Sequence, residues 1–222
     1  MKKMFIKIVP LLAALAGFGA FTGAQAQAAS GNAANGEKKA AMCIGCHGIP
    51  GYQASFPEIH KVPMISGQGA RYIASALSSY QKGDRKHPTM RGIAASLSDQ
   101  DILDLAAFYE KQGEGPAAPA KQPEPSAQVA ALLKKGACVT CHGDNFSKPT
   151  DPSYPKLSGQ HADYLFVALK SYQTVGNPQM GRANPTMAAQ VQTFSHAELK
   201  AIAQYLGSLE GELKVVPQPR FR

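Results

Sequence analysis

The sequence predicts an all-α fold built from two tandem, homologous domains. The first observation is an internal duplication: the 222-residue chain matches itself at several places in unchanged order. The second is that apolar residues recur at the three- and four-residue spacing of amphipathic helices. The third is that no long alternating run of Val, Ile, Thr and aromatic residues lies between the turns, so strand signals are absent.

Residues 1–28 have the pattern of a secretory signal peptide. Lysines near the start are followed by residues 8–21, which are apolar or small except for one proline. Small-x-small sites then place cleavage after Ala26 or Ala28. The apolar stretch is shorter than the roughly 20 residues of a bilayer span, so an uncleaved membrane anchor is the less favoured alternative. We therefore expect a periplasmic protein.

The duplication divides the rest of the chain. The equivalent segments are Cys43–Gly48 and Cys138–Gly143, Ile65–Gln68 and Leu157–Gln160, Pro88–Met90 and Pro185–Met187, and Leu97–Ile102 and Phe194–Leu199. We place the first domain at residues 29–115 and the second at residues 126–222. Residues 116–125 form a Pro/Ala-rich linker, whose composition favours an extended, semi-rigid connector.

Each domain is expected to contain three main helices. Ala-rich opening helices are predicted over residues 32–46 and 126–141. Middle helices follow, with apolar and tyrosine residues at helical spacing over 72–80 and 164–172. Closing helices begin at the capping-box patterns Ser98-x-x-Asp101 and Ser195-x-x-Glu198. The longer segment 51–63 of the first domain is interpreted as a loop-length variant, or else as a loop that shapes the edge of a binding site or a partner surface.

All four cysteines lie in two Cys-x-x-Cys-His motifs. The motifs are Cys43, Cys46 and His47, and Cys138, Cys141 and His142. This spacing is typical of c-type haem attachment, in which two thiols add to the haem vinyl groups and the adjacent histidine binds the iron. We predict two covalently attached haem c groups, one in each domain.

Three other uses of these cysteines fit the sequence less well. A thioredoxin-like pair requires a βαβ context, which the sequence does not offer. A zinc site requires four thiolates, or two with distant histidines, at spacings not found here. Structural disulfides suit an oxidising compartment but leave the two histidines at equal offset unexplained.

The second axial ligand of each iron should be a residue that both halves share. Met90 and Met187 each end a Pro-Thr-Met sequence, in segments that we expect to be non-helical. The other candidates lack a counterpart of the same type: Met42, His60, Met64, His87 and Met180. The predicted iron ligands are therefore His47 with Met90 and His142 with Met187. Thioether ligation raises the reduction potential, and two filled axial positions leave electron transfer as the natural task.

These residues resemble the class I c-type cytochromes, and specifically the two-haem cytochrome c4 family. The resemblance covers nearly the whole chain after the signal segment, from Gly36 to Leu209. It implies a periplasmic protein with two His/Met-ligated haems and four cysteine thioethers. It also implies electron transfer between a quinol-oxidising complex or dehydrogenase and a terminal oxidase.

As an electron carrier, the protein is not expected to be an enzyme. Two alternative functions are also considered. A dihaem subunit of a specific dehydrogenase, such as a flavocytochrome sulfide dehydrogenase, has much the same sequence pattern. A two-haem peroxidase requires an iron with an open sixth position, and the paired methionines argue against it. The expected partners are redox proteins, either membrane respiratory complexes or a periplasmic dehydrogenase, with peripheral membrane association as an option.

The formal charge of +8 does not by itself predict nucleic-acid binding. Lys and Arg occur in runs no longer than pairs, and no base-stacking motif accompanies them. Basic residues do lie near the methionines, at Arg85, Lys86, Arg91 and Arg182. We interpret them as ordinary solvated surface, or alternatively as a ring of charge around exposed haem edges that steers acidic partners.

Overall fold

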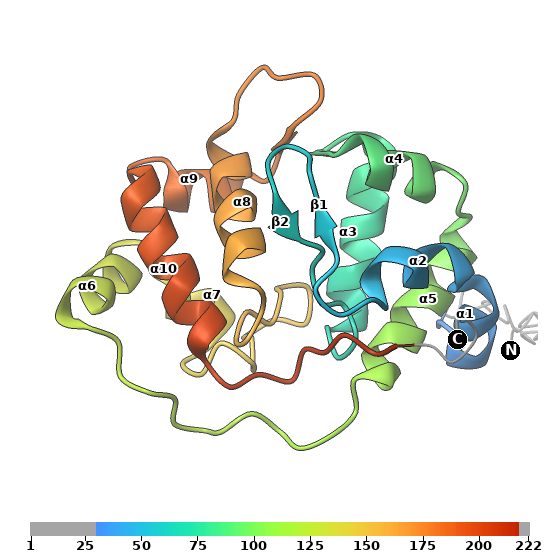
Figure 1. The fold of residues 1–222 in the computed structure, drawn as a ribbon, viewed down its shortest axis with the longest axis horizontal. Coiled ribbons are helices and arrows are strands. Elements are labelled where there is room, and N and C mark those ends of the chain that lie inside the picture. Colours follow the sequence, from blue (N-terminus) through green and yellow to red (C-terminus); the bar gives the residue numbers. More distant parts are fainter. Residues whose placement is uncertain (1–29, 218–222) are drawn as a thin grey trace, which may run out of the picture.

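The computed structural model describes residues 30–217, so the predicted signal peptide lies outside the described residues. Two helical domains lie side by side and are joined by an extended connector (Figure 1). The first domain contains α1 (Ala33–Lys39), α2 (Ala41–His47), α3 (Ala70–Lys82), α4 (Pro88–Ala95) and α5 (Asp99–Gln112). The second contains α6 (Ala127–Lys135), α7 (Cys138–His142), α8 (Ala162–Gln173), α9 (Pro185–Val191) and α10 (His196–Ser208). The helix-dominated, duplicated architecture confirms the predicted fold class.

The opening helix of each domain is broken, where the sequence predicted one continuous helix. In the first domain α1 ends at Lys39 and α2 begins at Ala41, on either side of the buried Ala40. In the second domain α6 ends at Lys135, and Ala137 adopts a left-handed conformation with φ of 46° before α7. That conformation interrupts the helical hydrogen-bond ladder, which apolar spacing alone does not reveal.

Within residues 30–217, four two-residue strands occur where no strand was expected. They are β1 (Gln53–Ala54), β2 (His60–Lys61), β3 (Arg85–Lys86) and β4 (Gly181–Arg182). β1 and β2 form an antiparallel hairpin within the first domain. β3 pairs antiparallel with β4 and so joins the two domains. A strand of two residues is too short to show an alternating apolar pattern, so no local pattern predicted these strands.

The first domain is organised around the crossing of α1 and α5. At Gly36 a side chain is excluded, because an added Cβ would lie 2.1 Å from the backbone oxygen of Asp104. The carboxylate of Asp104 is buried and accepts hydrogen bonds from the backbone N–H of Asn32, from Lys39 Nζ and from Gln100 Nε2, each at 2.8 Å. The small core beside this crossing consists of Ala40, Ile73, Leu105, Ala106 and Tyr109.

The second domain has a larger apolar core, between α6, α8, α9 and α10. Its buried residues are Leu132, Leu133, Phe146, Leu165, Val191, Phe194, Leu199, Ile202, Ala203, Leu206 and Leu209. The closing helices of both domains begin as predicted: the capping boxes of Ser98 with Asp101 and of Ser195 with Glu198 are both formed. These caps satisfy the free N–H groups of the first helical turn.

The connector and residues 209–214 run beside one another and return the chain to the first domain (Figure 1). Gln122 donates a hydrogen bond from Nε2 to the carbonyl of Glu210 at 2.7 Å, and the N–H of Ala118 donates to Glu212 at 3.2 Å. Lys214 then forms an isolated antiparallel bridge with Ser66. Within residues 30–217, no helix has the length and apolar character needed to cross a bilayer.

Candidate functional site

Each Cys-x-x-Cys-His motif lies on one short helix. Cys43, Cys46 and His47 are on α2, and the second motif occupies the whole of α7. Residues three positions apart lie on the same face of a helix, so the two thiols of each motif point to one side. The four cysteines are not joined in disulfides.

Both motif histidines are held in the tautomer that an iron ligand requires. His47 Nδ1 lies 2.8 Å from the carbonyl oxygen of Pro63, and His142 Nδ1 lies 3.0 Å from that of Pro155. A carbonyl can only accept, so Nδ1 carries the hydrogen and Nε2 keeps its lone pair. Burial lowers the pKa of both imidazoles, so they are neutral near pH 7.

The first thiol of each motif is not activated for disulfide exchange. Burial raises the pKa of Cys43, and it raises the pKa of Cys138 to about 11. Redox-active Cys-x-x-Cys pairs depend on a lowered thiol pKa, because the thiolate is the nucleophile. These two cysteines are therefore protonated near neutral pH, which disfavours the thioredoxin-like alternative.

Met90 and Met187 occupy the third position of α4 and α9, so the expectation that Pro-Thr-Met is non-helical was wrong. Pro is favoured at the first position of a helix, where its missing N–H costs no hydrogen bond. The N-cap residues are His87, whose Nδ1 accepts from the N–H of Met90 at 3.4 Å, and Asn184, whose Oδ1 accepts from the N–H of Met187 at 2.9 Å. Both methionines are partly buried, at equivalent places in the two domains.

A repeated glutamine fixes each methionine-bearing helix to the middle helix. Gln81 Nε2 donates to the carbonyls of Ala94 and Leu97, at 2.9 and 2.7 Å. Gln173 Nε2 donates in the same way to Val191 and Phe194, at 2.7 and 2.8 Å. Sequence reasoning assigned no function to these residues, although their position in the duplication was the signal that could have found them.

The basic residues near the methionines do not form one exposed ring. Arg85 and Arg182 are partly buried and lie opposite one another across the pairing of β3 with β4. Lys86 Nζ donates to the carbonyl of Asn177 in the other domain at 2.8 Å. Only Arg91 is exposed as expected. Arg85 and Arg182 are thus part of the domain interface, and their interpretation as ordinary solvated surface was wrong.

Two glutamines connect the domains reciprocally. Gln68 donates to the carbonyl of Lys156 at 3.0 Å and accepts from its N–H at 2.9 Å. Gln160 makes the equivalent pair of bonds with Met64, at 2.8 and 3.0 Å. Each glutamine thus satisfies both backbone groups of a residue in the other domain. Both glutamine side chains are almost fully buried.

The long segment of the first domain also reaches the second domain. Its β1–β2 hairpin lies between α3 and α8 (Figure 1). The N–H of Lys61 donates to Asp163 at 3.0 Å, and Glu58 forms an ion pair with Lys170 at 2.5 Å. The segment is therefore more than a loop-length variant, because it helps to hold the two domains together.

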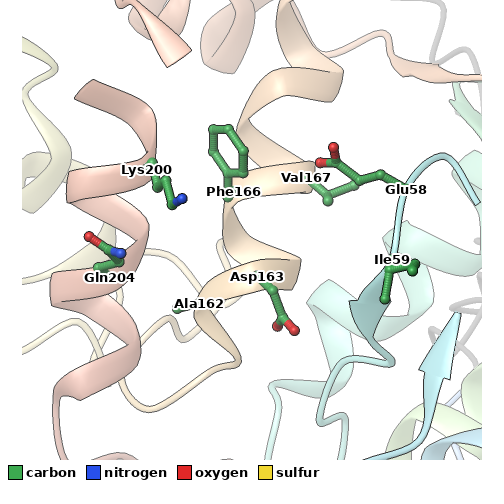
Figure 2. Close-up of a pocket in the computed structure, with 8 residues that line it drawn as sticks. All are labelled: Glu58, Ile59, Ala162, Asp163, Phe166, Val167, Lys200 and Gln204. Atoms are coloured by element: carbon green, nitrogen blue, oxygen red, sulfur yellow. The ribbon is translucent and has the colours of Figure 1, made fainter. Parts of the chain in front are cut away.

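A surface groove of about 340 Å³ borders this hairpin. Figure 2 shows Glu58 and Ile59 on the hairpin side, Phe166 and Val167 on α8, and Lys200 on α10. None of the eight predicted haem-binding residues lines it. The groove is thus separate from the candidate haem sites.

The donor set in each domain fits a covalently attached haem. It comprises two thiols on one helical face, a neutral imidazole with a free Nε2 next to them, and a thioether on a separate, anchored helix. Sulfur and imidazole are the ligands by which c-type haem iron is held. The same set occurs twice, at equivalent positions.

Comparisons with known proteins agree with this fit. A sequence model of the family described as Cytochrome c matches residues 33–112 and 126–210. Cytochrome c4 of Azotobacter vinelandii is 32% identical, covering 82% of this chain and 90% of the relative. A thiosulfate dehydrogenase electron acceptor of Stutzerimonas stutzeri is 31% identical, covering 83% and 88%. The crystal structure of reduced recombinant cytochrome c4 from Pseudomonas stutzeri superposes with a TM-score of 0.57 at 26% identity, covering 82% of this chain and all of that one.

Proposed function

Because this chain belongs to the cytochrome c family, and within it to the dihaem cytochrome c4 proteins, we propose that it carries electrons between a quinol-oxidising complex or dehydrogenase and a terminal oxidase. Cytochrome c4 proteins are electron carriers with two covalent haem c groups, so the coarse function is electron transfer to and from redox partners. We place this transfer in the periplasm, with the predicted signal peptide as support.

We assign His47 and Met90 to the first iron and His142 and Met187 to the second. Cys43, Cys46, Cys138 and Cys141 form the thioethers. A bound haem iron supplies a one-electron couple. The observation that carries the assignment is its exact repetition: each histidine is oriented by a proline carbonyl, and each methionine stands in the capped first turn of a short helix.

The residues around each donor favour rapid electron transfer with little rearrangement. The Nδ1 hydrogen bond keeps the imidazole ring in one orientation. The N-cap and the glutamine at each methionine-bearing helix limit movement of the thioether. A histidine and a methionine bound to each iron would leave no open position there for a substrate.

We keep residues 29–115 and 126–222 as the two domains and residues 116–125 as the linker. The grouping of α1 to α5 in the first range and α6 to α10 in the second supports this division. Each range contains one complete set of the proposed haem-binding residues.

The second candidate function is electron acceptance from a specific dehydrogenase. The similarity to a thiosulfate dehydrogenase electron acceptor favours a periplasmic dehydrogenase of this kind as the donor. Gentle purification from the native membrane and periplasmic fractions separates the two candidates. A stoichiometric complex with a catalytic subunit supports the second, whereas recovery of the cytochrome alone, active with a terminal oxidase, supports the first.

Substitution of single methionines tests the ligand assignment. Met90→Ala and Met187→Ala should each abolish the far-red thioether-to-iron absorption band of one ferric haem and lower the potential of that haem, because a thioether stabilises ferrous iron. Met42→Ala is the matched control, since Met42 is 51% exposed and has no counterpart in the second domain. If both bands persist in Met90→Ala or Met187→Ala, that assignment is wrong.

A further inference from the structure

A buried tyrosine hydroxyl in the first domain has no hydrogen-bond partner. Tyr109 lies on α5 and is only 2% exposed, and no group among residues 30–217 completes a hydrogen bond with its hydroxyl. An unpaired buried hydroxyl is costly, so each one in a native structure calls for an explanation. The hydroxyl therefore points to a partner that the described part of the chain does not itself supply.

This hydroxyl is a neighbour of the first haem-attachment cysteine. Tyr109 and Cys43 belong to the same small core of the first domain. Burial raises the pKa of the Cys43 thiol, and the Tyr109 hydroxyl partly offsets that rise, as a hydrogen-bond donor near a sulfur does. The two groups are thus close enough to interact, although they form no regular hydrogen bond in this structure.

The phenol is held in place and keeps its hydrogen. The carbonyl of Tyr109 accepts from the N–H of Gly67 at 2.8 Å, and its ring meets that of Phe108 edge to face, with centres 5.0 Å apart. Burial, and then the neighbouring Cys43, raise the pKa of Tyr109 far above its ordinary value, so the hydroxyl is protonated near pH 7. A thioether sulfur has no hydrogen and can only accept. The tyrosine is therefore the donor and the sulfur the acceptor.

The second domain lacks this hydroxyl. In the duplication Tyr109 corresponds to Leu206, eleven residues after the serine of each capping box. The backbone contact is the same, because the carbonyl of Leu206 accepts from the N–H of Gly159 at 3.0 Å. Leu206 also shares its core with Cys138, the counterpart of Cys43. The two attachment sites thus differ in one polar group although their proposed donor sets are alike.

We propose that the Tyr109 hydroxyl donates a hydrogen bond to the sulfur of Cys43 when that sulfur is a haem thioether, and that this bond raises the potential of the first haem alone. The proposal rests on the proposed haem assignment and deepens it. Tyr109 acts through Cys43 and is a positioning residue. It makes two otherwise repeated electron-carrying sites unequal.

The direction of the effect follows from electrostatics. A hydrogen bond draws electron density away from the sulfur, and the O–H dipole directs its positive end toward the attachment site. Both effects favour the ferrous state, which carries one more electron than the ferric state. Hydrogen bonding around the iron and its attachment is one of the means by which a protein sets a haem potential.

Tyr109→Phe in the full holoprotein removes the hydroxyl and keeps the buried ring. In an optical redox titration the first reduction equilibrium should fall by about threefold, or ~28 mV at ~59 mV per tenfold change. The second should not change. Met90→Ala and Met187→Ala assign each potential to its domain beforehand. Tyr205→Phe is the matched control and should move neither potential, because the hydroxyl of Tyr205 is on α10 and donates to the Pro123 carbonyl at 2.9 Å.

An isotope measurement on the wild type needs no variant. Resonance Raman spectra report the carbon–sulfur stretching bands of the thioethers. After equilibration in D2O the hydroxyl of Tyr109 carries deuterium, which alters a hydrogen bond to sulfur. One thioether band should therefore shift in the wild type. The same band should not respond to D2O in Tyr109→Phe.

Three results would overturn the proposal. They are an unchanged first potential in Tyr109→Phe, an equal fall of both potentials, and wild-type thioether bands that do not respond to D2O. If Tyr109→Phe does not retain two haems, the wild-type isotope measurement decides. None of these readouts depends on the electron donor or acceptor. A pyridine haemochrome count below two in the wild type would instead overturn the haem assignment itself.

Discussion

At the scale of single residues, the buried carboxylate of Asp104 connects the first and last helices of the first domain, α1 and α5. It receives hydrogen bonds from α1, from the residue that caps α1, and from its own helix α5. The hydrogen bonds from Lys39, from the N–H of Asn32 and from Gln100 hold its pKa below the ordinary value of 3.8. A carboxylate with a depressed pKa stabilises the fold above its unfolded-state pKa and loses this effect as the pH falls through its folded-state pKa.

Asp104→Asn should therefore destabilise the protein most near neutral pH. We expect denaturant unfolding to show a clear loss of stability at about pH 7. The difference from the wild type should be smaller at a second, acidic pH below the folded-state pKa of Asp104, where both proteins carry an uncharged group. Asp99→Asn is the control, because Asp99 is exposed in the first turn of the same helix. An equal loss of stability at both pH values would show that the charge of Asp104 is not what matters.

Single residues were also where the sequence was most informative. The Cys-x-x-Cys-His spacing is fixed by haem chemistry, and the helices present those residues on one side as that chemistry requires. Arg85 and Arg182 could not be interpreted correctly, because their surroundings depend on a strand pairing between residues far apart in the chain. No local pattern distinguishes an arginine at an interface from one in solvent.

The helices that bear the methionines depend on their caps at the scale of secondary structure. α4 and α9 have eight and seven residues, which is too short for helical propensity alone to stabilise them. Their N-cap side chains differ, a histidine in one domain and an amide in the other, yet each accepts from the methionine N–H. The two domains thus provide a natural comparison between a histidine and an asparagine at the same N-cap position.

His87→Ala should weaken the first methionine-bearing helix by about 1 kcal/mol through loss of the cap. The expected result is that the far-red band of one haem disappears at a lower denaturant concentration than in the wild type. His87→Asn copies the cap of the second domain and should retain most of the stability. Equal behaviour of the alanine and asparagine variants would contradict this role of the cap.

Short elements were predicted less well than long ones for a physical reason. The closing helices have 14 and 13 residues and begin at capping boxes, so their periodicity and their starts were both visible. α4 and α9 have barely two turns, and a proline occurs both in irregular structure and at the first position of a helix, where Pro88 and Pro185 lie. The breaks at Ala40 and Ala137 depend on backbone conformation and tertiary packing that Ala-rich sequences do not encode locally.

The two domains form one molecule through contacts that the duplication repeats. Gln68 and Gln160 each form hydrogen bonds with the backbone N–H and carbonyl of a residue in the other domain. The β1–β2 hairpin of the first domain adds a hydrogen bond to the second domain, and the second domain has no equivalent hairpin among the described residues. The composition of the Pro-rich linker does not reveal these contacts. Interfaces between distant segments are determined by tertiary structure, which a local sequence pattern does not encode.

The double variant Gln68→Ala/Gln160→Ala should loosen the domain interface. Each change leaves a backbone N–H and carbonyl of the other domain without a protein partner, which costs about 1–3 kcal/mol per buried group. Small-angle scattering should show a larger radius of gyration, and unfolding should become less cooperative. Gln128→Ala, at an exposed position on α6, should change neither measurement. A double variant as compact and cooperative as the wild type would show that the hairpin and the arginine pair are sufficient.

The bridge between Lys214 and Ser66 also has a consequence for the order in which the molecule assembles. Residues 210–214 follow the last helix of the second domain, and they contact the connector and the first domain together. Domains generally fold as units, so the helices of each domain can pack before this segment docks. The segment therefore docks last, onto two domains whose helices have already packed. Damage to it should leave the domains folded while delaying or preventing their final assembly.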